Sequence, residues 1–260
     1  MKKWILALSL FLQAAAFAGP YEQLFELFGI SPQAMPAEIV AETHRLWAQP
    51  SKERWEYDRR FEELRAQLWP LFDELHLLQA QKPQKMHYHY ALVVGALLSR
   101  VEDRVHFLTD LYKEGIQFDQ IVFLTGERPL LDAEQSLTGL KTEREMAEWV
   151  YARSDLPKEI PVLFIDAPMK KGSKTTYYLN RIARPGLNDT LFFWLKTNPT
   201  PGDALLISSQ PYLNYHQAVA EHHLPDPFTV EPAGPAASPT ASVALILDTL
   251  AKQLSWQNLP

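Results

Sequence analysis

Cysteine is missing from this sequence altogether, and its absence removes several kinds of chemistry. No disulfide can form, no thiolate can act as a nucleophile, and no metal site can use a cysteine ligand. The protein must therefore be stabilised by a packed core. With 47% hydrophobic residues in a chain of 260, the sequence supplies enough apolar side chains for one or two domains.

Basic residues are also few, with 25 Lys and Arg against 31 Asp and Glu and a formal net charge of -6. A nucleic-acid groove needs a basic stripe that displaces counterions, so no nucleic-acid partner is expected. Four of the eight histidines form two close pairs, at His87 and His89 and at His222 and His223, and neither pair comes with a third ligand. The sequence therefore predicts no metal site.

Long apolar runs are confined to the N-terminus. Lys2 and Lys3 precede the apolar run 4–11, and an Ala-Phe-Ala pattern ends at Ala18. This order is typical of a secretory signal peptide, so residues 1–18 are expected to be cleaved. No later segment approaches the roughly 20 apolar residues of a membrane-spanning helix. We expect an exported, periplasmic protein with no transmembrane segment after signal cleavage.

Residues 19–86 have the apolar spacing of amphipathic helices. Helices are expected over 37–47, 51–69 and 71–81, with prolines breaking the pattern between them. The sequence thus predicts a helical N-terminal region whose apolar side chains pack against the next domain.

From residue 87 onward, apolar runs alternate with amphipathic segments. Strands are expected over 90–95, 120–125, 161–166, 204–208 and 228–231, and helices over 100–114, 143–153, 174–184, 187–197, 212–222 and 242–255. This alternation is typical of parallel strands joined by right-handed crossovers. The expected fold class is α/β: a Rossmann-like doubly wound, mainly parallel five-stranded sheet over 87–260, preceded by the helical region.

Polar residues and glycines follow each expected strand. The carboxyl ends of parallel strands meet at one edge of a sheet, where ligands bind. We expect Glu127 and Glu143 to be acid–base candidates, with pKa values raised if they are buried. The expected ligand-binding residues are Gly95, Arg104, Thr125, Gly126, Ser173, Thr176, Ser208 and Ser209.

An anion is the ligand that these residues suit, because Arg104 and Ser173 lie near helix N-termini, where backbone N–H groups are open. Two alternatives stay open at this point. Arg104 could lie on a solvated face beside Glu102 or Asp103, and Ser173 could be a simple helix cap. Neither a Walker loop nor a Gly-x-Ser-x-Gly elbow occurs.

The order of these motifs over residues 90–254 resembles the bacterial SanA/ElyC/YdcF family. The resemblance is carried by Gly95, Arg104, Thr125-Gly126-Glu127, Thr142-Glu143, Ser173-x-x-Thr176 and Ser208-Ser209. It implies a Rossmann-like fold and a role in envelope integrity and in peptidoglycan or lipid-carrier homeostasis. One cytoplasmic member of the family is reported to bind S-adenosylmethionine.

The chain departs from the family pattern in three places. The family's first loop is usually richer in glycine than the segment Gly95-Ala-Leu-Leu here. The family's Ser-x-Asn-Thr-x-Glu-Asn has Tyr178 and Leu179 here in place of Glu and Asn. Its Ser-x-x-His-x-x-Arg has Tyr212 and Tyr215 in place of His and Arg.

Two functions therefore compete. One is an exported envelope protein that binds a small polar anionic ligand, phosphorylated or nucleotide-like, as an enzyme or as a binding protein. The other is a non-catalytic interaction protein with a degenerate ligand site and the N-terminal helices as its docking surface. The sequence identifies neither a cofactor nor an oligomeric state.

Overall fold

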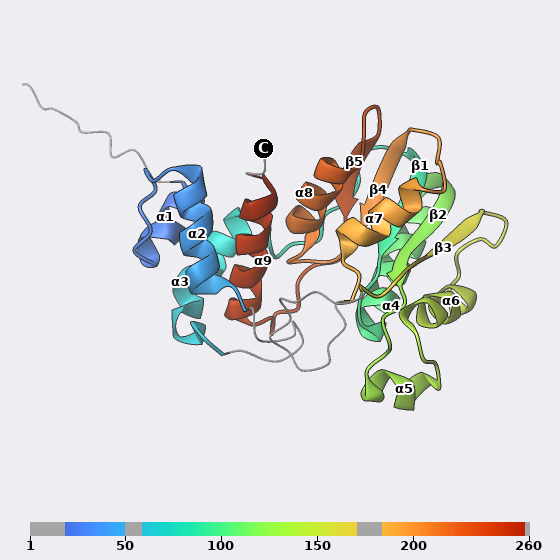
Figure 1. Cartoon of the computed structure of the whole chain (residues 1–260), viewed down its shortest axis with the longest axis horizontal. Coiled ribbons are helices and arrows are strands. Elements are labelled where there is room, and N and C mark those ends of the chain that lie inside the picture. Colours follow the sequence, from blue (N-terminus) through green and yellow to red (C-terminus); the bar gives the residue numbers. More distant parts are fainter. Residues whose placement is uncertain (1–18, 50–58, 171–183, 258–260) are drawn as a thin grey trace, which may run out of the picture.

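The computed structural model describes residues 19–49, 59–170 and 184–257 (Figure 1). Five strands form one sheet in the order β3-β2-β1-β4-β5, and every neighbouring pair is parallel. This confirms the expected Rossmann-like α/β fold. The two most apolar runs are neighbours, with Tyr90 opposite Gln120. The strands are β1 (His87–Val94), β2 (Gln117–Gly126), β3 (Val162–Ala167), β4 (Asp203–Ile207) and β5 (Thr229–Ala233).

Helices cover both faces of this sheet, which explains the continuous apolar runs of its strands. Val93 and Phe123 pack on the face covered by α4 (Leu98–Lys113) and α6 (Glu143–Arg153). Leu92 and Leu124 pack on the face covered by α7 (Leu187–Leu195) and α8 (Leu213–His223). A short helix that the sequence did not predict, α5 (Asp132–Thr138), connects β2 to α6.

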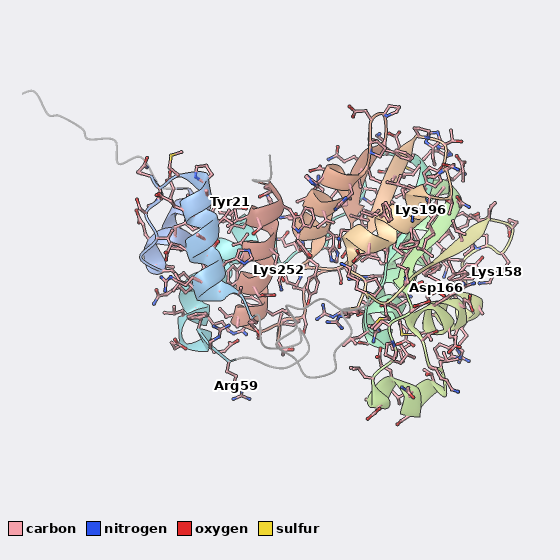
Figure 2. All side chains as sticks on the ribbon, in the orientation of Figure 1. Tyr21, Arg59, Lys158, Asp166, Lys196 and Lys252 are labelled. Carbon is pink, nitrogen blue, oxygen red and sulfur yellow. The ribbon has the colours of Figure 1, made fainter. Side chains whose placement is uncertain are left out.

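The N-terminal helices have a core of their own, which they share with the C-terminal helix α9 (Val243–Gln257). Figure 1 shows α9 between these helices and α8. Gln253 of α9 donates to the hydroxyl of Tyr21, labelled in Figure 2, over 3.3 Å. The helices are α1 (Pro20–Leu27), α2 (Pro36–Trp47), the 3-10 turn η1 (Glu62–Leu64) and α3 (Arg65–Glu74).

Two expectations for this helical region were wrong. Pro70 does not separate two helices but lies in the middle of α3, where it removes one backbone hydrogen bond. The helix expected over 71–81 ends at Glu74, because His76 adopts a left-handed φ of 55° that no helix continues through. Residues 50–58 and most of the helix expected over 174–184 lie outside the described residues.

Within the described ranges, no helix combines the length and the apolar character that crossing a membrane requires.

Candidate functional site

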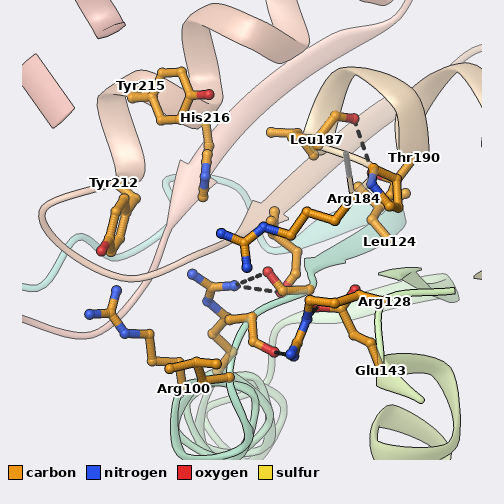
Figure 3. A pocket seen from close by; sticks show the side chains of 17 residues that line it. Arg100, Leu124, Arg128, Glu143, Arg184, Leu187, Thr190, Tyr212, Tyr215 and His216 are labelled. Atoms are coloured by element: carbon orange, nitrogen blue, oxygen red, sulfur yellow. Dashed lines mark hydrogen bonds and ion pairs between the residues drawn. The ribbon is translucent and has the colours of Figure 1, made fainter. Parts of the chain in front are cut away.

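A cavity of about 270 Å³ opens at the carboxyl edge of the sheet, above β1 and β2 (Figure 3). Its walls come from the ends of β1 and β2 and from α4, α6, α7 and α8. The chain continues from β1 to β2 on one side and reaches β4 on the other, so this is the point where the strand order reverses. Open parallel sheets bind ligands at this position. The lining residues are Val94, Gly95, Ala96, Leu97, Arg100, Arg104, Leu124, Arg128, Glu143, Arg184, Pro185, Gly186, Leu187, Thr190, Tyr212, Tyr215 and His216.

Arg104 joins the two halves of the sheet at this cavity. Its Nη1 donates to the carbonyl oxygens of Val94, over 2.5 Å, and Gly95, over 3.1 Å. Its Nη2 donates to the hydroxyls of Ser208, over 3.3 Å, and Ser209, over 3.2 Å. Four of the residues predicted to bind a ligand, Gly95, Arg104, Ser208 and Ser209, are thereby in direct contact.

The charge of Arg104 has no carboxylate partner among the described residues. The side chain is 1% exposed, and all four of its acceptors are neutral. Its Nε is buried without a hydrogen-bond partner. Burial, and then the nearby charge of Arg100, lower the pKa of Arg104 to about 9, so the guanidinium is still charged at neutral pH.

Glu143 is the carboxylate that faces the cavity. Thr142 caps α6: its hydroxyl accepts from Glu145 N over 3.2 Å, and the Glu145 carboxylate returns to Thr142 N over 3.2 Å. These two hydrogen bonds form a capping box, which fixes the start of the helix that carries Glu143. Glu143 is buried and accepts from Gly126 N over 3.2 Å and from Arg128 Nε over 3.4 Å. Burial raises the pKa of Glu143 more than Arg128 lowers it.

A second buried arginine, Arg128, closes the wall behind Glu143. It pairs with Glu134 of α5 over 3.1 Å and donates to the carbonyl of Ala96 over 2.9 Å. Glu134 also accepts from the backbone N–H of Leu98, over 2.8 Å, at the start of α4. Sequence reasoning missed Arg128 and Glu134, because nothing in their spacing indicates that the segment after β2 folds back over α4.

The opposite wall is aromatic. Arg100 lies over the ring of Tyr212 at 4.7 Å, and Tyr212 stacks on His216 with ring centres 5.7 Å apart. His216 Nδ1 is 2.7 Å from the hydroxyl of Ser208. Figure 3 shows Arg100, Arg184, Tyr212 and His216 around the same cavity as Glu143. A lone histidine on a helix carries no sequence signal for such a position, which explains why His216 was not predicted.

Two of the predicted site residues, Gly95 and Gly126, must be glycine because neighbouring atoms leave no room for a Cβ. A Cβ on Gly95 would lie 2.9 Å from both Glu143 Oε1 and the carbonyl oxygen of Leu124. A Cβ on Gly126 would lie 2.3 Å from a ring carbon of Pro185. Any larger residue at either position would push a wall of the cavity out of place.

Two further predicted site residues, Thr125 and Glu127, do not line the cavity. Thr125 is fully buried and donates its hydroxyl proton to the Ile165 carbonyl, so it joins β2 to β3. Glu127 is exposed and accepts from Met169 N over 3.1 Å, away from the cavity lining. Ser173 and Thr176 lie outside the described residues.

Metal binding is not indicated where the structure describes the chain, since no three His, Asp or Glu side chains gather there. Comparison with known proteins gives no relative: no family model matches the chain, and no curated protein or solved structure matches it significantly.

Proposed function

We propose that this chain is an exported cell-envelope protein of the SanA/ElyC/YdcF type that binds a polar anionic ligand, phosphorylated or nucleotide-like, in the cavity. It acts in envelope or peptidoglycan homeostasis. The observation that supports an anionic ligand is Arg104, a fully buried guanidinium that donates, among the described residues, only to neutral acceptors, two carbonyls and two hydroxyls. The envelope role rests on the signal-like N-terminus and on the order of the family motifs.

Burying a charge is costly unless it is paired, and unpaired buried charges are rare in folded proteins. The hydrogen bonds of Arg104 offset this cost only in part. Two carbonyls and two hydroxyls accept from its N–H groups, but they do not neutralise its charge. An anion in the cavity supplies the missing countercharge. Arg100 lines the same cavity and repels Arg104, so it increases the excess of positive charge there.

The alternative, an interaction protein that docks through its N-terminal helices, has less support. The apolar side chains of these helices, such as Leu24, Trp47 and Leu68, are buried against one another and against α9. The loop after β4 also depends on this region, since Gln210 donates to the carbonyls of His76 and Gln79. We therefore assign residues 19–86 a supporting role in the site.

Titration calorimetry with inorganic phosphate, adenosine monophosphate and chloride tests the anion site. We expect the two phosphates to bind and chloride to show no measurable heat. Arg104→Met should weaken phosphate binding by at least about tenfold, because charge-assisted hydrogen bonds are lost. The matched control is Arg45→Met, which changes an exposed arginine of α2 paired only with Glu42.

If Arg104→Met does not fold, the wild-type protein still decides. Phosphate should raise its thermal midpoint relative to potassium chloride of equal ionic strength, because a ligand that binds only the folded state stabilises it. Equal midpoints, or full phosphate affinity in a folded Arg104→Met variant, would refute the anion site.

Export is tested separately by the intact mass of the protein recovered from a Gram-negative producing cell. We expect residues 1–18 to be missing and the product to be released with the periplasmic fraction. A full-length product that stays in the cytoplasm would remove the envelope role, and it would leave the anion site standing.

A further inference from the structure

The charge balance of the cavity indicates more than one negative charge on its ligand. Arg100 and Arg104 both line the cavity, and neither forms an ion pair with a carboxylate of the described chain. Arg128 is different, since Glu134 and Glu143 both contact it. Within the described chain, two guanidinium groups therefore have no ion-pair partner, and they repel each other, while Glu143 and Asp103 attract Arg104 only at longer range. A dianion neutralises both, whereas a monoanion leaves one positive charge in place.

Glu143 raises a difficulty for such a ligand, because its carboxylate lines the same cavity. Its contacts are long, at 3.4 Å to Arg128 Nε and 3.2 Å to Gly126 N, so it is incompletely neutralised. An ionised Glu143 beside a bound dianion would be repelled in a buried site of low dielectric. A protonated Glu143 instead offers an O–H donor to a ligand oxygen.

We propose that the ligand is a phosphate monoester bound as its dianion, and that Glu143 takes up one proton from solvent when the ligand binds. This rests on the proposed anion site and specifies its substrate class. The free protein with ionised Glu143, the dianion and one proton give a complex in which Glu143 is neutral, so charge and protons balance. The phosphate oxygens face Arg100 and Arg104, and the Glu143 hydroxyl donates to one of them.

The other charged groups around Glu143 fit this arrangement. Arg128 and the Gly126 N–H face it from the segment after β2, and Arg104 faces it from α4. Arg184 lowers the pKa of Glu143 from the side of α7, and His216 lines the cavity from α8. Burial is the largest influence on Glu143 and raises its pKa above the ordinary value, which makes proton uptake by this carboxylate easier when the ligand binds.

Calorimetry with glycerol phosphate tests the proposal at about pH 8, where a phosphate monoester is a dianion. Titrations in buffers of different ionisation enthalpy give the number of protons taken up. We expect up to about one proton per wild-type protein, and an affinity that falls by up to about tenfold for each pH unit above the pKa of Glu143. Glu143→Gln should still bind glycerol phosphate, because its amide mimics the protonated acid as a donor, and it should take up no proton through this residue.

Glu148→Gln is the matched control, since Glu148 lies on the same helix but pairs with Arg144 at the surface. It should show the proton uptake of the wild type. A sulfate monoester, which has the same shape and one charge less, should bind more weakly and with less proton uptake.

The outcomes separate the two proposals. If neither ester binds, the anion site itself is wrong. If glycerol phosphate binds without proton uptake, if the wild type and Glu143→Gln take up equal numbers of protons, or if the sulfate ester binds as tightly, this inference is wrong and the anion site stands. Should Glu143→Gln not fold, the wild-type proton uptake and its pH dependence decide alone.

Discussion

Arg104 and Ser208 meet across the point where the strand order of the sheet reverses. Arg104 lies on the helix after β1, Ser208 follows β4, and Nη2 of the arginine is 3.3 Å from the serine hydroxyl. Ser208 in turn is 2.7 Å from His216 Nδ1. One buried guanidinium thus holds together the two halves of the cavity, although its charge is not neutralised there. This makes Arg104 a residue that favours ligand binding and, in the free protein, opposes stability.

Replacing Arg104 with methionine should therefore cost little stability or none. A buried unpaired charge often destabilises a protein relative to an apolar side chain of similar volume. Since burial lowers the pKa of Arg104 to about 9, its destabilising effect is present at neutral pH and is relieved as the pH rises through that value. Urea unfolding without phosphate should give Arg104→Met a free energy of unfolding within about 1 kcal/mol of the wild type or above it. A loss of about 3 kcal/mol or more would show that Arg104 is mainly structural.

Glu143 should make stability depend on pH in the opposite direction to an ordinary salt-bridged carboxylate. Because its pKa is raised in the folded protein, its contribution is fully present below the unfolded pKa and is lost as the pH rises through the folded pKa. Glu143→Gln should remove this loss. Relative to the wild type, the variant should gain about 1.4 kcal/mol at high pH for each unit by which the pKa of Glu143 is raised.

Urea unfolding at about pH 4 and about pH 8 measures this difference, since the ordinary pKa of a glutamate lies near the lower value. Glu148→Gln, at the exposed surface of the same helix, should change stability equally at both pH values. A Glu143→Gln variant that is destabilised more at high pH than at low pH would mean that the carboxylate is well paired.

Gly95→Ala should damage the cavity from within. The added methyl group would stand 2.9 Å from Glu143 Oε1 and from the Leu124 carbonyl, so either the carboxylate or the strand must move. We expect a loss of about 1–3 kcal/mol in the free energy of unfolding and a loss of phosphate binding. Gly19→Ala is the control, because nothing lies within 4 Å of a Cβ there. Unchanged phosphate affinity in Gly95→Ala would place the ligand elsewhere.

The sheet was predictable because its signals are local. Each buried strand carries a continuous apolar run, and pairs such as Tyr90 and Gln120 follow from two such runs joined by one helix. Gly95, Glu143, Ser208 and Ser209 were found for the same reason, since they follow strands or begin a helix at one edge of the sheet, and Arg104 lies in the helix that follows β1.

Contacts between segments far apart in the sequence could not be predicted in this way. The pairing of Arg128 with Glu134 depends on how the segment after β2 folds, and that segment is polar and aperiodic. The packing of α9 on the N-terminal helices depends on a return of the chain after more than a hundred residues. Glu127 was predicted to be an acid–base candidate because it follows a strand, but the turn after β2 directs its side chain to the surface.

Gln210 provides the last prediction, because it connects the site to the helical region. Its Nε2 donates to the carbonyls of His76, over 2.8 Å, and Gln79, over 3.1 Å, where the chain leaves α3. Ser209, which accepts from Arg104, is its neighbour in the chain. Gln210→Ala should leave two partly buried carbonyls without this donor and lower the free energy of unfolding by about 1 kcal/mol.

The loop that carries Ser208 and Ser209 should also be held less well, so phosphate affinity should fall several-fold while the number of sites stays at one. Calorimetry of Gln210→Ala beside Gln217→Ala checks this, since Gln217 lies on α8 and contacts only Glu221 at the surface. If Gln210→Ala were as destabilised as expected but bound phosphate with wild-type affinity, the helical region would stabilise the fold without positioning the site. An affinity loss in Gln210→Ala alone assigns residues 19–86 the role of holding the ligand-binding loop in place.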